Sequence, residues 1–247
     1  MIVIPARFNS TRLPGKPLLN RTGKYLIQHV VEQASQAKLA DRVVVATDDQ
    51  RIFAAVESFG GHCELTQSTH LSGTDRIAEV AARAAFARYD IVVNVQGDEP
   101  EIAPELIDDL IAACSTPSTG MSTASAPVAS QQELLSPNVV KVVCDQQSRA
   151  MYFSRSVIPF DREGDIKSPA DLGGYYQKHL GIYAYRRDVL LQLAAAPPCH
   201  LECVEKLEQL RALYLGHKIL VIRTNNAPHG IDTPSDYEAF VARRSLV

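Results

Sequence analysis

The sequence lacks both of the glycine fingerprints that mark the common nucleotide-binding loops. GxGxxG is missing after the first apolar run, which argues against a dinucleotide-binding first turn. GxxxxGKS/T is missing too, because Gly15 and Lys16 are followed by Pro17 and no glycine stands at the required position upstream. Internal repeats, low-complexity tracts and heptad arrays are also missing. These absences exclude solenoids and coiled coils, and any phosphate-binding loop must be of another kind.

Neither sign of charge dominates. The 247 residues include 25 Lys and Arg against 28 Asp and Glu, a formal net charge of −3, and the isoelectric point is about 6.2. Such a chain has no broad basic field with which to bind nucleic acid. A small anionic substrate would therefore need cations gathered at one place.

Long apolar runs and paired cysteines are missing as well. No apolar run reaches the length of a membrane span, and the first residues show no charged region followed by an apolar segment and a cleavage site. The five cysteines are an odd, scattered set, so we expect reduced thiols. Cys199, His200 and Cys203 lack the second pair of ligands that a structural metal site needs. We expect a cytoplasmic protein with no membrane insertion.

What the chain does contain is an alternation of short apolar runs and amphipathic stripes. We expect strands at residues 1–4, 42–46, 62–66, 90–95, 121–126, 139–144, 150–153, 178–186 and 219–222. We expect helices at 23–37, 50–59, from 72, at 104–113, at 201–215 and from 234. This order favours βαβ units and a parallel sheet covered on both faces, with more antiparallel pieces in the second half. A length of 247 residues with 46% apolar residues fits one α/β domain, or one with a small appendage.

The polar loop after the first apolar run is the most distinctive stretch. We expect Pro5 to end the strand, and the loop then carries Arg7, Arg12 and Lys16 with several hydroxyls and Gly15. Arg offers a planar fork of donors, Lys a mobile point charge, and the backbone adds N–H groups, which together suit a polyphosphate. Open α/β sheets bind ligands at the carboxyl ends of their strands. The plainer alternative is a solvated basic turn.

Two acidic positions are candidates for holding a metal ion. Asp98 follows the clearest central strand, and Gly97 before it lets the backbone approach a ligand closely. Pro100 halts the strand and leaves Asp98 and Glu99 exposed. Mg²⁺ at a triphosphate takes one or two carboxylates together with phosphate oxygens. The alternative for Asp98 is a cap on the next helix, and Asp232 either caps the last helix or returns to the site as a second carboxylate.

Three further stretches leave their roles open. The segment from Ser72 to Asp75 has the form of a helix start and equally that of a ligand-binding loop, and the two readings are compatible. Residues 160–174 are charged and broken by Gly and Pro, so they are an insertion, a mobile lid or a solvent-facing connection. His179 stands at the entry of a strand, where a lone His is more often structural than catalytic.

Several long motifs stand in one order along the chain. They read IPARFNSTRLPGKPL, ATDD, SGTDR, VNVQGDEP, YFSRSVIP, KHLGIYAYR, LEQLR and GIDTP. In this order and spacing the sequence closely resembles the CMP-Kdo synthetases, the 3-deoxy-manno-octulosonate cytidylyltransferases, nearly from end to end. RLPGKPL alone is typical of the wider nucleotide-sugar transferases, whereas YFSRSVIP with HLGIYAYR makes the resemblance specific.

The resemblance implies a fold, a reaction and partners. The fold is a Rossmann-like three-layer nucleotide-diphospho-sugar transferase fold, with a mixed, mostly parallel sheet and a small antiparallel extension. It implies one nucleotidyltransferase domain over 1–247, with a sugar-binding and dimerisation insertion at about 150–190. The anomeric 2-hydroxyl of Kdo attacks the α-phosphorus of CTP, which releases pyrophosphate and yields CMP-Kdo. Mg²⁺, a cytoplasmic homodimer and a role upstream of lipopolysaccharide or capsule assembly are implied as well.

The resemblance also assigns roles to individual residues. The implied catalytic residues are Arg7, Lys16, Asp98 and Asp232, of which Asp98 and Asp232 bind the metal. The implied nucleotide-binding residues are Ala6, Arg7, Arg12, Lys16, Ser72, Gly73 and Gln96. The implied sugar-binding residues are Arg76, Arg155, Arg162, His179, Tyr183, Glu208 and Gln209. Nucleotidyl transfer needs positioning and charge neutralisation more than covalent catalysis, which fits this set.

The sequence departs from the family pattern in two segments. Residues 23–27 read GKYLI where the family commonly has GKPMI, and the segment 160–174 has its own length, which puts closure and fine sugar specificity in doubt.

An 8-amino Kdo as the preferred sugar stays open, whereas the second-half motifs disfavour sialic acid. An inactive nucleotide sensor would be expected to lose Lys16, Asp98 or Asp232, and all three are present. A nicotinamide oxidoreductase would need the missing glycine fingerprint.

Overall fold

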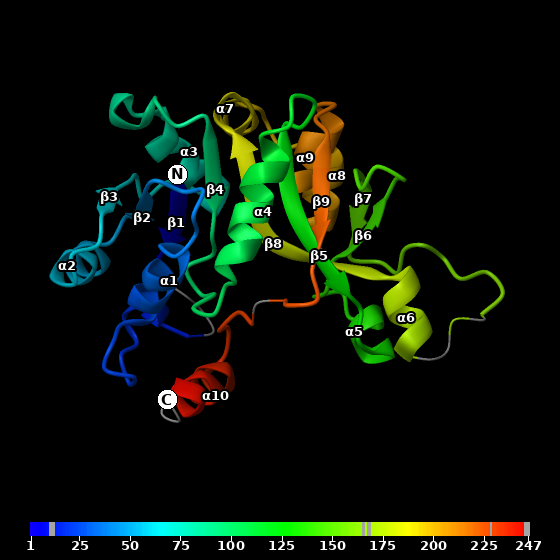
Figure 1. Cartoon of the computed structure of the whole chain (residues 1–247), viewed down its shortest axis with the longest axis horizontal. Helices are drawn as coiled ribbons and strands as arrows, with labels where there is room; N and C mark the ends of the chain where they lie inside the picture. The colour runs from blue at the N-terminus through cyan, green and yellow to red at the C-terminus, as the bar shows by residue number, and fades with distance from the viewer. Residues whose placement is uncertain (10–12, 165, 167–168, 228, 245–247) are drawn as a thin grey trace. The chain divides into compact units, whose positions relative to one another are not determined.

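The chain folds into two compact units. The computed structural model describes residues 1–9, 13–164, 166, 169–227 and 229–244 (Figure 1). The first unit consists of Met1–Asp108 with Pro228–Val247, and the second of Asp109–Ala227. The chain therefore leaves the first unit, builds the second, and returns to complete the first. The predicted single domain with an insertion at 150–190 stays a prediction.

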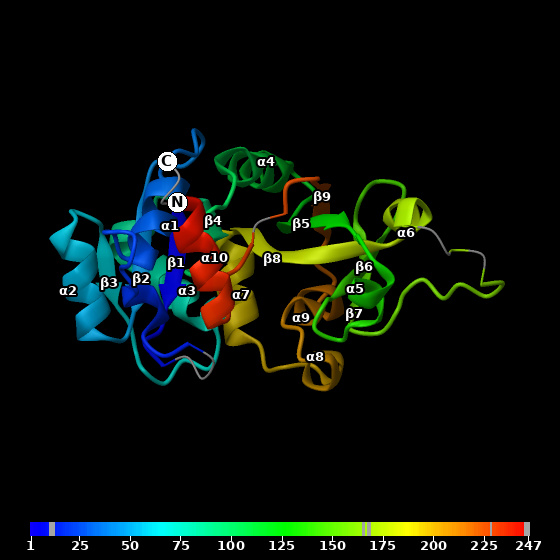
Figure 2. The same ribbon diagram turned by 90° about the horizontal axis from the view of Figure 1, so that it is seen from below.

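The first unit contains a parallel sheet with the strand order β3-β2-β1-β4. Its strands are β1 (Ile2–Ala6), β2 (Val43–Thr47), β3 (Cys63–Leu65) and β4 (Ile91–Asn94). Its helices are α1 (Leu26–Ala34), α2 (Gln50–Ser58), α3 (Gly73–Ala82) and α10 (Pro234–Arg244), with the short 3₁₀ helices η1 (Lys16–Leu18) and η2 (Ala84–Phe86). Helices α1 and α3 both pack on β1 and β2, so the predicted βαβ alternation is confirmed here (Figure 2).

The expectation that Pro5 ends the first strand is wrong. Pairing of β1 with β2 continues through Ala6 and Thr47, whereas pairing with β4 ends at Val3 and Asn94. Because β1 has no β4 partner at Pro5, the missing N–H of the proline leaves no ladder position on that side unfilled. The polar loop therefore begins after Ala6, two residues later than the sequence indicated.

The second unit supplies the antiparallel part of the fold. Its strands are β5 (Met121–Pro127), β6 (Lys141–Cys144), β7 (Ala150–Ser154), β8 (Gln177–Arg186) and β9 (Ile219–Arg223). Strand β5 runs antiparallel to β8 and parallel to β9, and β6 runs antiparallel to both β7 and β8. The helices are α5 (Gln131–Leu135), α6 (Pro169–Tyr175), α7 (Arg187–Ala195), α8 (His200–Glu205) and α9 (Gln209–Tyr214), while α4 (Pro104–Cys114) carries the chain from the first unit into the second. The predicted mixed fold with an antiparallel extension is confirmed.

The single helix expected at 201–215 is in fact two short helices. Lys206 ends α8 in the left-handed conformation, with φ of 55°. Arg155 stabilises the end of α8, because its Nε donates to the carbonyl of Glu205 at 2.7 Å. Leu207 and Leu210 are buried on either side of the start of α9, so the apolar stripe is real although the helix is interrupted. Periodicity alone does not detect a single left-handed residue.

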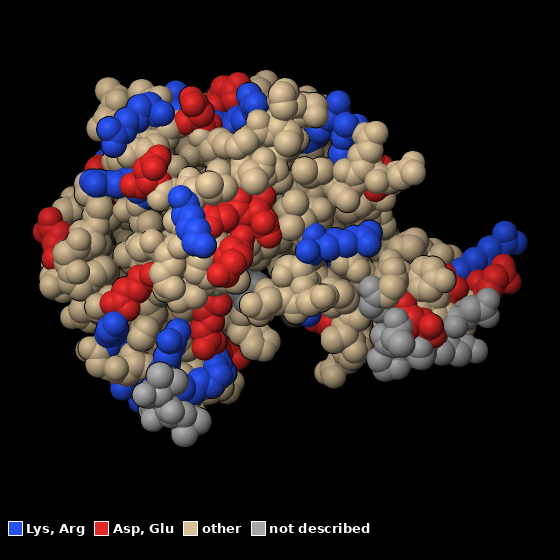
Figure 3. Space-filling view, viewed as in Figure 1, with Lys and Arg blue, Asp and Glu red and all other residues tan. Residues whose placement is uncertain are grey.

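The surface and the helices agree with the composition. Positive and negative side chains are interspersed over the face shown in Figure 3, with no wide basic patch on it. Within the described part of the chain, no helix is both long enough and apolar enough to cross a membrane.

Candidate active site

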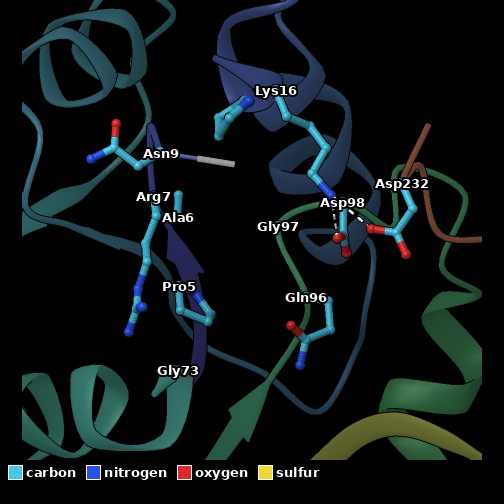
Figure 4. A pocket seen from close by; sticks show the side chains of 11 residues that line it. Pro5, Ala6, Arg7, Asn9, Lys16, Gly73, Gln96, Gly97, Asp98 and Asp232 are labelled. Atoms are coloured by element: carbon cyan, nitrogen blue, oxygen red, sulfur yellow. Dashed lines mark hydrogen bonds and ion pairs between the residues drawn. The ribbon is translucent and has the colours of Figure 1, made fainter. Parts of the chain in front are cut away.

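The loop after β1 is shaped by a tight turn before Lys16. Gly15 adopts a left-handed conformation with φ of 67°, and its N–H donates to the carbonyl of Phe8 at 3.1 Å. Helix η1 starts directly afterwards at Lys16, with Pro17 in its first turn. This turn directs the Lys16 side chain back toward the carboxyl end of the sheet (Figure 4). Arg12, a predicted nucleotide ligand, lies outside the described residues.

Lys16 joins two carboxylates that are far apart in the sequence. Its Nζ donates to Oδ2 of Asp98 at 2.7 Å and to Oδ1 of Asp232 at 3.2 Å, as Figure 4 shows. A third hydrogen bond runs from Nζ to the carbonyl of Ile231 at 2.8 Å. The Lys16 side chain is only 13% exposed, whereas those of Asp98 and Asp232 are 28% and 44% exposed. The three predicted residues therefore form one charged cluster that opens to solvent on the carboxylate side.

Asp232 reaches this cluster because the segment before α10 is anchored. The N–H of Ile231 donates to the carbonyl of Asp98 at 2.9 Å, and the Ile231 side chain is buried with Leu26 and Phe240. The alternative role of helix cap belongs to Thr233 instead, whose Oγ1 accepts from the N–H of Asp236 at 3.2 Å. Oδ2 of Asp236 in turn accepts from the N–H of Thr233 at 2.8 Å and from that of Asp232 at 3.0 Å. Asp232 is thus held by its backbone, and its carboxylate is available to the cluster.

Glu99 does not belong to the exposed carboxylate pair that the sequence suggested. Its side chain is buried, and burial, with a smaller contribution from the charge of Asp98, raises the pKa of Glu99 to about 8. Glu99 is therefore mostly protonated at neutral pH, which leaves Asp98 and Asp232 as the anionic oxygen donors of the cluster. Two carboxylates that are 28% and 44% exposed fit Mg²⁺ that is also bound by phosphate oxygens. Among the described residues no group of three His, Cys, Asp or Glu side chains is placed to hold a metal by itself.

Gly97 is required because the backbone of β1 passes close to it. A Cβ at Gly97 would lie 2.9 Å from the carbonyl oxygen of Pro5. We expect Gly97→Ala to lower the free energy of unfolding by about 1–3 kcal/mol, the usual cost of an overpacked position. Urea unfolding measures this change, and Gly181→Ala is the matched control because nothing lies within 4 Å of its added Cβ. An unchanged free energy of unfolding in Gly97→Ala would contradict the close approach.

A cavity of about 390 Å³ lies beside the cluster. Its lining residues are Pro5, Ala6, Arg7, Asn9, Lys16, Pro17, Gly73, Gln96, Gly97, Asp98 and Asp232. The structure thus gathers most of the predicted nucleotide-binding residues around one hollow, with Arg7 and Gly73 across it from Lys16 (Figure 4). Ser72 does not line the cavity; its Oγ accepts from the N–H of Asp75 at 3.1 Å and caps α3.

A second cavity of about 370 Å³ adjoins the first at Arg7 and Asn9. Its other lining residues are Phe8, Asp48, Asp49 and Ser68. Sequence reasoning did not assign a role to Asp48 and Asp49, although ATDD follows β2 just as the polar loop follows β1. The carboxyl ends of parallel neighbours meet at one edge of the sheet, and that signal was available in the sequence.

Arg76 lies in the interior rather than on an open surface. Its side chain is fully buried, with Nη2 at 3.2 Å from Oδ2 of Asp48 and Nη1 hydrogen-bonded to Oγ1 of Thr66. This environment ties α3 to the ends of β2 and β3. That Arg76 binds the sugar stays a prediction. Its contacts with Asp48 and Thr66 are those of a buried residue that holds the elements around the site together.

The predicted sugar-binding residues other than Arg76 lie in the second unit. His179 and Tyr183 stand on β8 with their rings 5.3 Å apart, and the His179 ring meets Phe153 edge-on at 5.0 Å. Nε2 of His179 lies 3.0 Å from Oγ1 of Thr123 on β5. At the start of α9, Glu208 is exposed and Gln209 is buried. The second unit thus presents a polar, aromatic cluster whose sugar-binding role stays a prediction.

The two predicted arginines of the second unit differ sharply. The Arg155 guanidinium donates to three backbone carbonyls, those of Glu205 at 2.7 Å, Pro137 at 2.9 Å and Lys206 at 3.4 Å. Arg162 is 89% exposed and, within the described part of the chain, pairs with Glu163 at 3.6 Å. Arg155 is therefore engaged by the protein, whereas Arg162 remains accessible to a ligand. The lid suggested for 160–174 falls partly outside the described residues.

His179 is expected to be uncharged at neutral pH. Burial lowers the pKa of His179 to about 3, from 6.5 in an unfolded chain. Since the unfolded chain binds a proton below pH 6.5 and the native chain does not, this residue's contribution to stability is present above pH 6.5. We expect that contribution to be lost as the pH falls from 6.5 toward 3.

Urea unfolding at several pH values measures this loss. The decline in stability with falling pH is expected to be smaller in His179→Gln than in wild type, and unchanged in His200→Gln, which replaces an exposed histidine of the same unit. Equal declines in wild type and His179→Gln would contradict a neutral His179.

Comparisons with known proteins show that this chain is similar to cytidylyltransferases. The family model described as Cytidylyltransferase matches residues 1–219. The 3-deoxy-manno-octulosonate cytidylyltransferase of Geobacter sulfurreducens is 49% identical over 241 residues, which cover 96% of this chain and 95% of that protein. The enzyme of the same name from Yersinia pestis is 48% identical over 240 residues, covering 96% and 94%.

Solved structures give the same result. A CMP:2-keto-3-deoxy-manno-octonic acid synthetase complexed with CTP matches with a TM-score of 0.90 and 42% identity, covering 99% of this chain and 98% of that one. A 4-diphosphocytidyl-2C-methyl-D-erythritol synthase from Anaerococcus prevotii shares the fold at a TM-score of 0.63 and 13% identity, covering 99% and 98%. The sequence motifs and these matches together mean that the chain belongs to the 3-deoxy-manno-octulosonate cytidylyltransferase family.

Proposed function

We propose that this chain transfers the cytidylyl group of CTP to 3-deoxy-manno-octulosonate, or Kdo, and releases pyrophosphate. The observation that carries the proposal is the cluster in which Lys16 contacts Asp98 and Asp232 beside a cavity in the first unit. The family membership supports the same reaction, since its curated relatives are named for it.

The chain's own residues divide the task of binding CTP. Arg7 and Lys16 stand on opposite sides of the 390 Å³ cavity and would hold the triphosphate between them. Gly73 and Gln96 line the same hollow and are assigned to the cytosine and ribose, together with Ala6. Lys16 would then stabilise the negative charge that develops on the departing pyrophosphate.

Asp98 and Asp232 would hold Mg²⁺. When bound, this ion would neutralise the α-phosphate and lower the pKa of the attacking 2-hydroxyl of the sugar. In the absence of the ion, Lys16 compensates the two carboxylates, with hydrogen bonds of 2.7 and 3.2 Å. If a metal compensated the negative charge of the two carboxylates, the Lys16 ammonium would be able to contact phosphate oxygens.

The sugar would bind through the second unit. Kdo is an acid, so its carboxylate needs cations and donors, and the exposed Arg162 offers an accessible guanidinium. His179 and Tyr183 would contribute hydrogen bonds. Burial holds His179 in its neutral form, so it would bind the sugar as an uncharged imidazole. Arg155, Glu208 and Gln209 are assigned to the same subsite. We also infer a cytoplasmic homodimer that supplies an activated sugar for lipopolysaccharide or capsule assembly.

The experiment that tests the proposal is pyrophosphate release from CTP and Kdo, with Mg²⁺ and with a chelator. We expect release only with Mg²⁺ and both substrates, and a product with the mass of CMP-Kdo. Parallel reactions with 8-amino Kdo and with sialic acid identify the preferred acid. Nucleotide binding without pyrophosphate release from any of these sugars would overturn the proposed reaction.

A further inference from the structure

Among the residues that the structure describes, one backbone carbonyl holds Arg7 at the rim of the nucleotide cavity. The guanidinium of Arg7 is exposed, and its Nη2 donates to the carbonyl oxygen of His70 at 2.8 Å. Arginine has five N–H donors, so this bond leaves the others available for phosphate oxygens. The position of His70 therefore decides where the remaining donors of Arg7 point.

Glu79 on α3 fixes the loop that carries His70. This loop, residues 67–72, lies between β3 and α3. Oε2 of Glu79 accepts from the N–H of Gln67 at 2.9 Å and from Nε2 of His70 at 2.6 Å. The loop is thus tied at its start and near its end to one carboxylate oxygen.

The other oxygen of Glu79 has a separate task. Oε1 accepts from Nη2 of Arg83 one turn later on α3, at 2.7 Å. Burial opposes the charge on Glu79, but the hydrogen bonds from Gln67, His70 and Arg83 outweigh it and lower the pKa of Glu79 to about 2. The carboxylate is therefore ionised throughout the physiological range and remains a strong acceptor.

Neither Glu79 nor His70 lines the nucleotide cavity, so their influence on the nucleotide is indirect, and Arg7 is the cavity residue that the His70 carbonyl contacts. We propose that Glu79 is a positioning residue for the cytidylyl transfer: it fixes the 67–72 loop, and the His70 carbonyl then presents Arg7 to the triphosphate. This inference rests on the proposed function, in which Arg7 binds phosphate. A long side chain that is already ordered loses less rotamer entropy when it binds, which is the physical gain.

A double-mutant cycle between Glu79 and Arg7 tests the proposal. CTP affinity is measured by titration calorimetry, which needs no turnover, and steady-state kinetics give kcat and the KM for each substrate. We expect Glu79→Ala to weaken CTP binding about tenfold and to leave the KM for Kdo unchanged. In the Arg7→Ala background the same change is expected to have no further effect, because the residue through which Glu79 acts is gone.

Two further variants separate the loop contacts from general support of α3. Arg83→Ala removes the bond to Oε1 together with the bonds of Arg83 to Glu64 and to the carbonyl of Leu65, but it leaves both bonds to Oε2. CTP affinity is therefore expected to stay within about twofold of wild type. His70→Phe keeps the carbonyl that binds Arg7 but removes the side-chain link to Glu79, and we expect an intermediate loss. Glu79→Gln retains an acceptor oxygen and is expected to restore part of the affinity that Glu79→Ala loses.

The outcomes are distinct. If Glu79→Ala weakens CTP binding equally with and without Arg7, or if Arg83→Ala weakens it as much, the positioning role is overturned. Should Glu79→Ala fail to fold, unchanged CTP affinity in both His70→Phe and Glu79→Gln overturns it instead. A wild-type protein that binds CTP but releases no pyrophosphate defeats the proposed reaction, whereas the calorimetric cycle still decides the role of Glu79.

Discussion

Replacing Asp98 by asparagine is expected to lower turnover of CTP and Kdo by about three orders of magnitude while leaving the fold intact. Asparagine keeps the size of the side chain but removes the charge that pairs with Lys16 at 2.7 Å and would bind Mg²⁺. A thousandfold loss corresponds to about 4 kcal/mol of transition-state stabilisation, the scale of a lost metal or oxyanion contact. Pyrophosphate release measured across a range of Mg²⁺ concentrations gives both the turnover and the metal requirement.

The matched control for this variant precedes the strand that Asp98 follows. Asp90 is exposed just before β4, at the opposite end of the strand from Asp98, so Asp90→Asn makes the same chemical change away from the site. We expect it to retain wild-type turnover, and both variants to keep the wild-type circular dichroism spectrum. Full turnover in Asp98→Asn would remove Asp98 from the metal-binding role.

Replacing Lys16 by methionine is expected to lower kcat/KM for CTP by about two to three orders of magnitude. The variant loses the ammonium proposed to bind the triphosphate, and it leaves Asp98 and Asp232 facing each other without a cation between them. Two close carboxylates repel, so the folded state should also be less stable in a chelator. Added Mg²⁺ is expected to recover that stability, since the ion replaces the missing positive charge.

Thermal unfolding with a chelator and with Mg²⁺ measures this second effect independently of activity. Lys24→Met serves as the control, because Lys24 is an exposed lysine that pairs only with Glu32 at 2.7 Å in the described structure. Its kinetics and its response to Mg²⁺ are expected to match wild type. If Lys16→Met unfolds at the wild-type temperature in chelator, Lys16 does not compensate the two carboxylates.

Much of the fold could be predicted because its signals are local. The strands and helices of the first unit follow from apolar runs and amphipathic stripes, and Ser72 was recognisable as a cap from its own short segment. Two local predictions failed. Pro5 stays in β1 because the β4 ladder has already ended there, and Lys206 interrupts the helix expected at 201–215 with a left-handed backbone.

The residue types of the candidate site could be predicted from the sequence, but the surroundings of several of its residues in the fold could not. The motifs indicated Lys16, Asp98 and Asp232, whereas the burial of Glu99, the interior position of Arg76 and the cavity beside Asp48 and Asp49 were not foreseen. Each of these depends on what packs against the residue from a distant part of the chain. A sequence motif contains the same carboxylate residue whether the folded protein buries it or exposes it to solvent.

The sequence by itself determined the family of this protein, the alternation of its strands and helices, and the cationic loop that follows β1, because each depends on neighbouring residues. Only the tertiary structure decided that the chain returns from the second unit with Ile231 docked on Asp98, and that Asp232 therefore meets Lys16. It also decided that Glu79 holds the loop on which Arg7 rests. These contacts join residues between 9 and 216 positions apart, and only packing and hydrogen bonding in the folded chain can establish them.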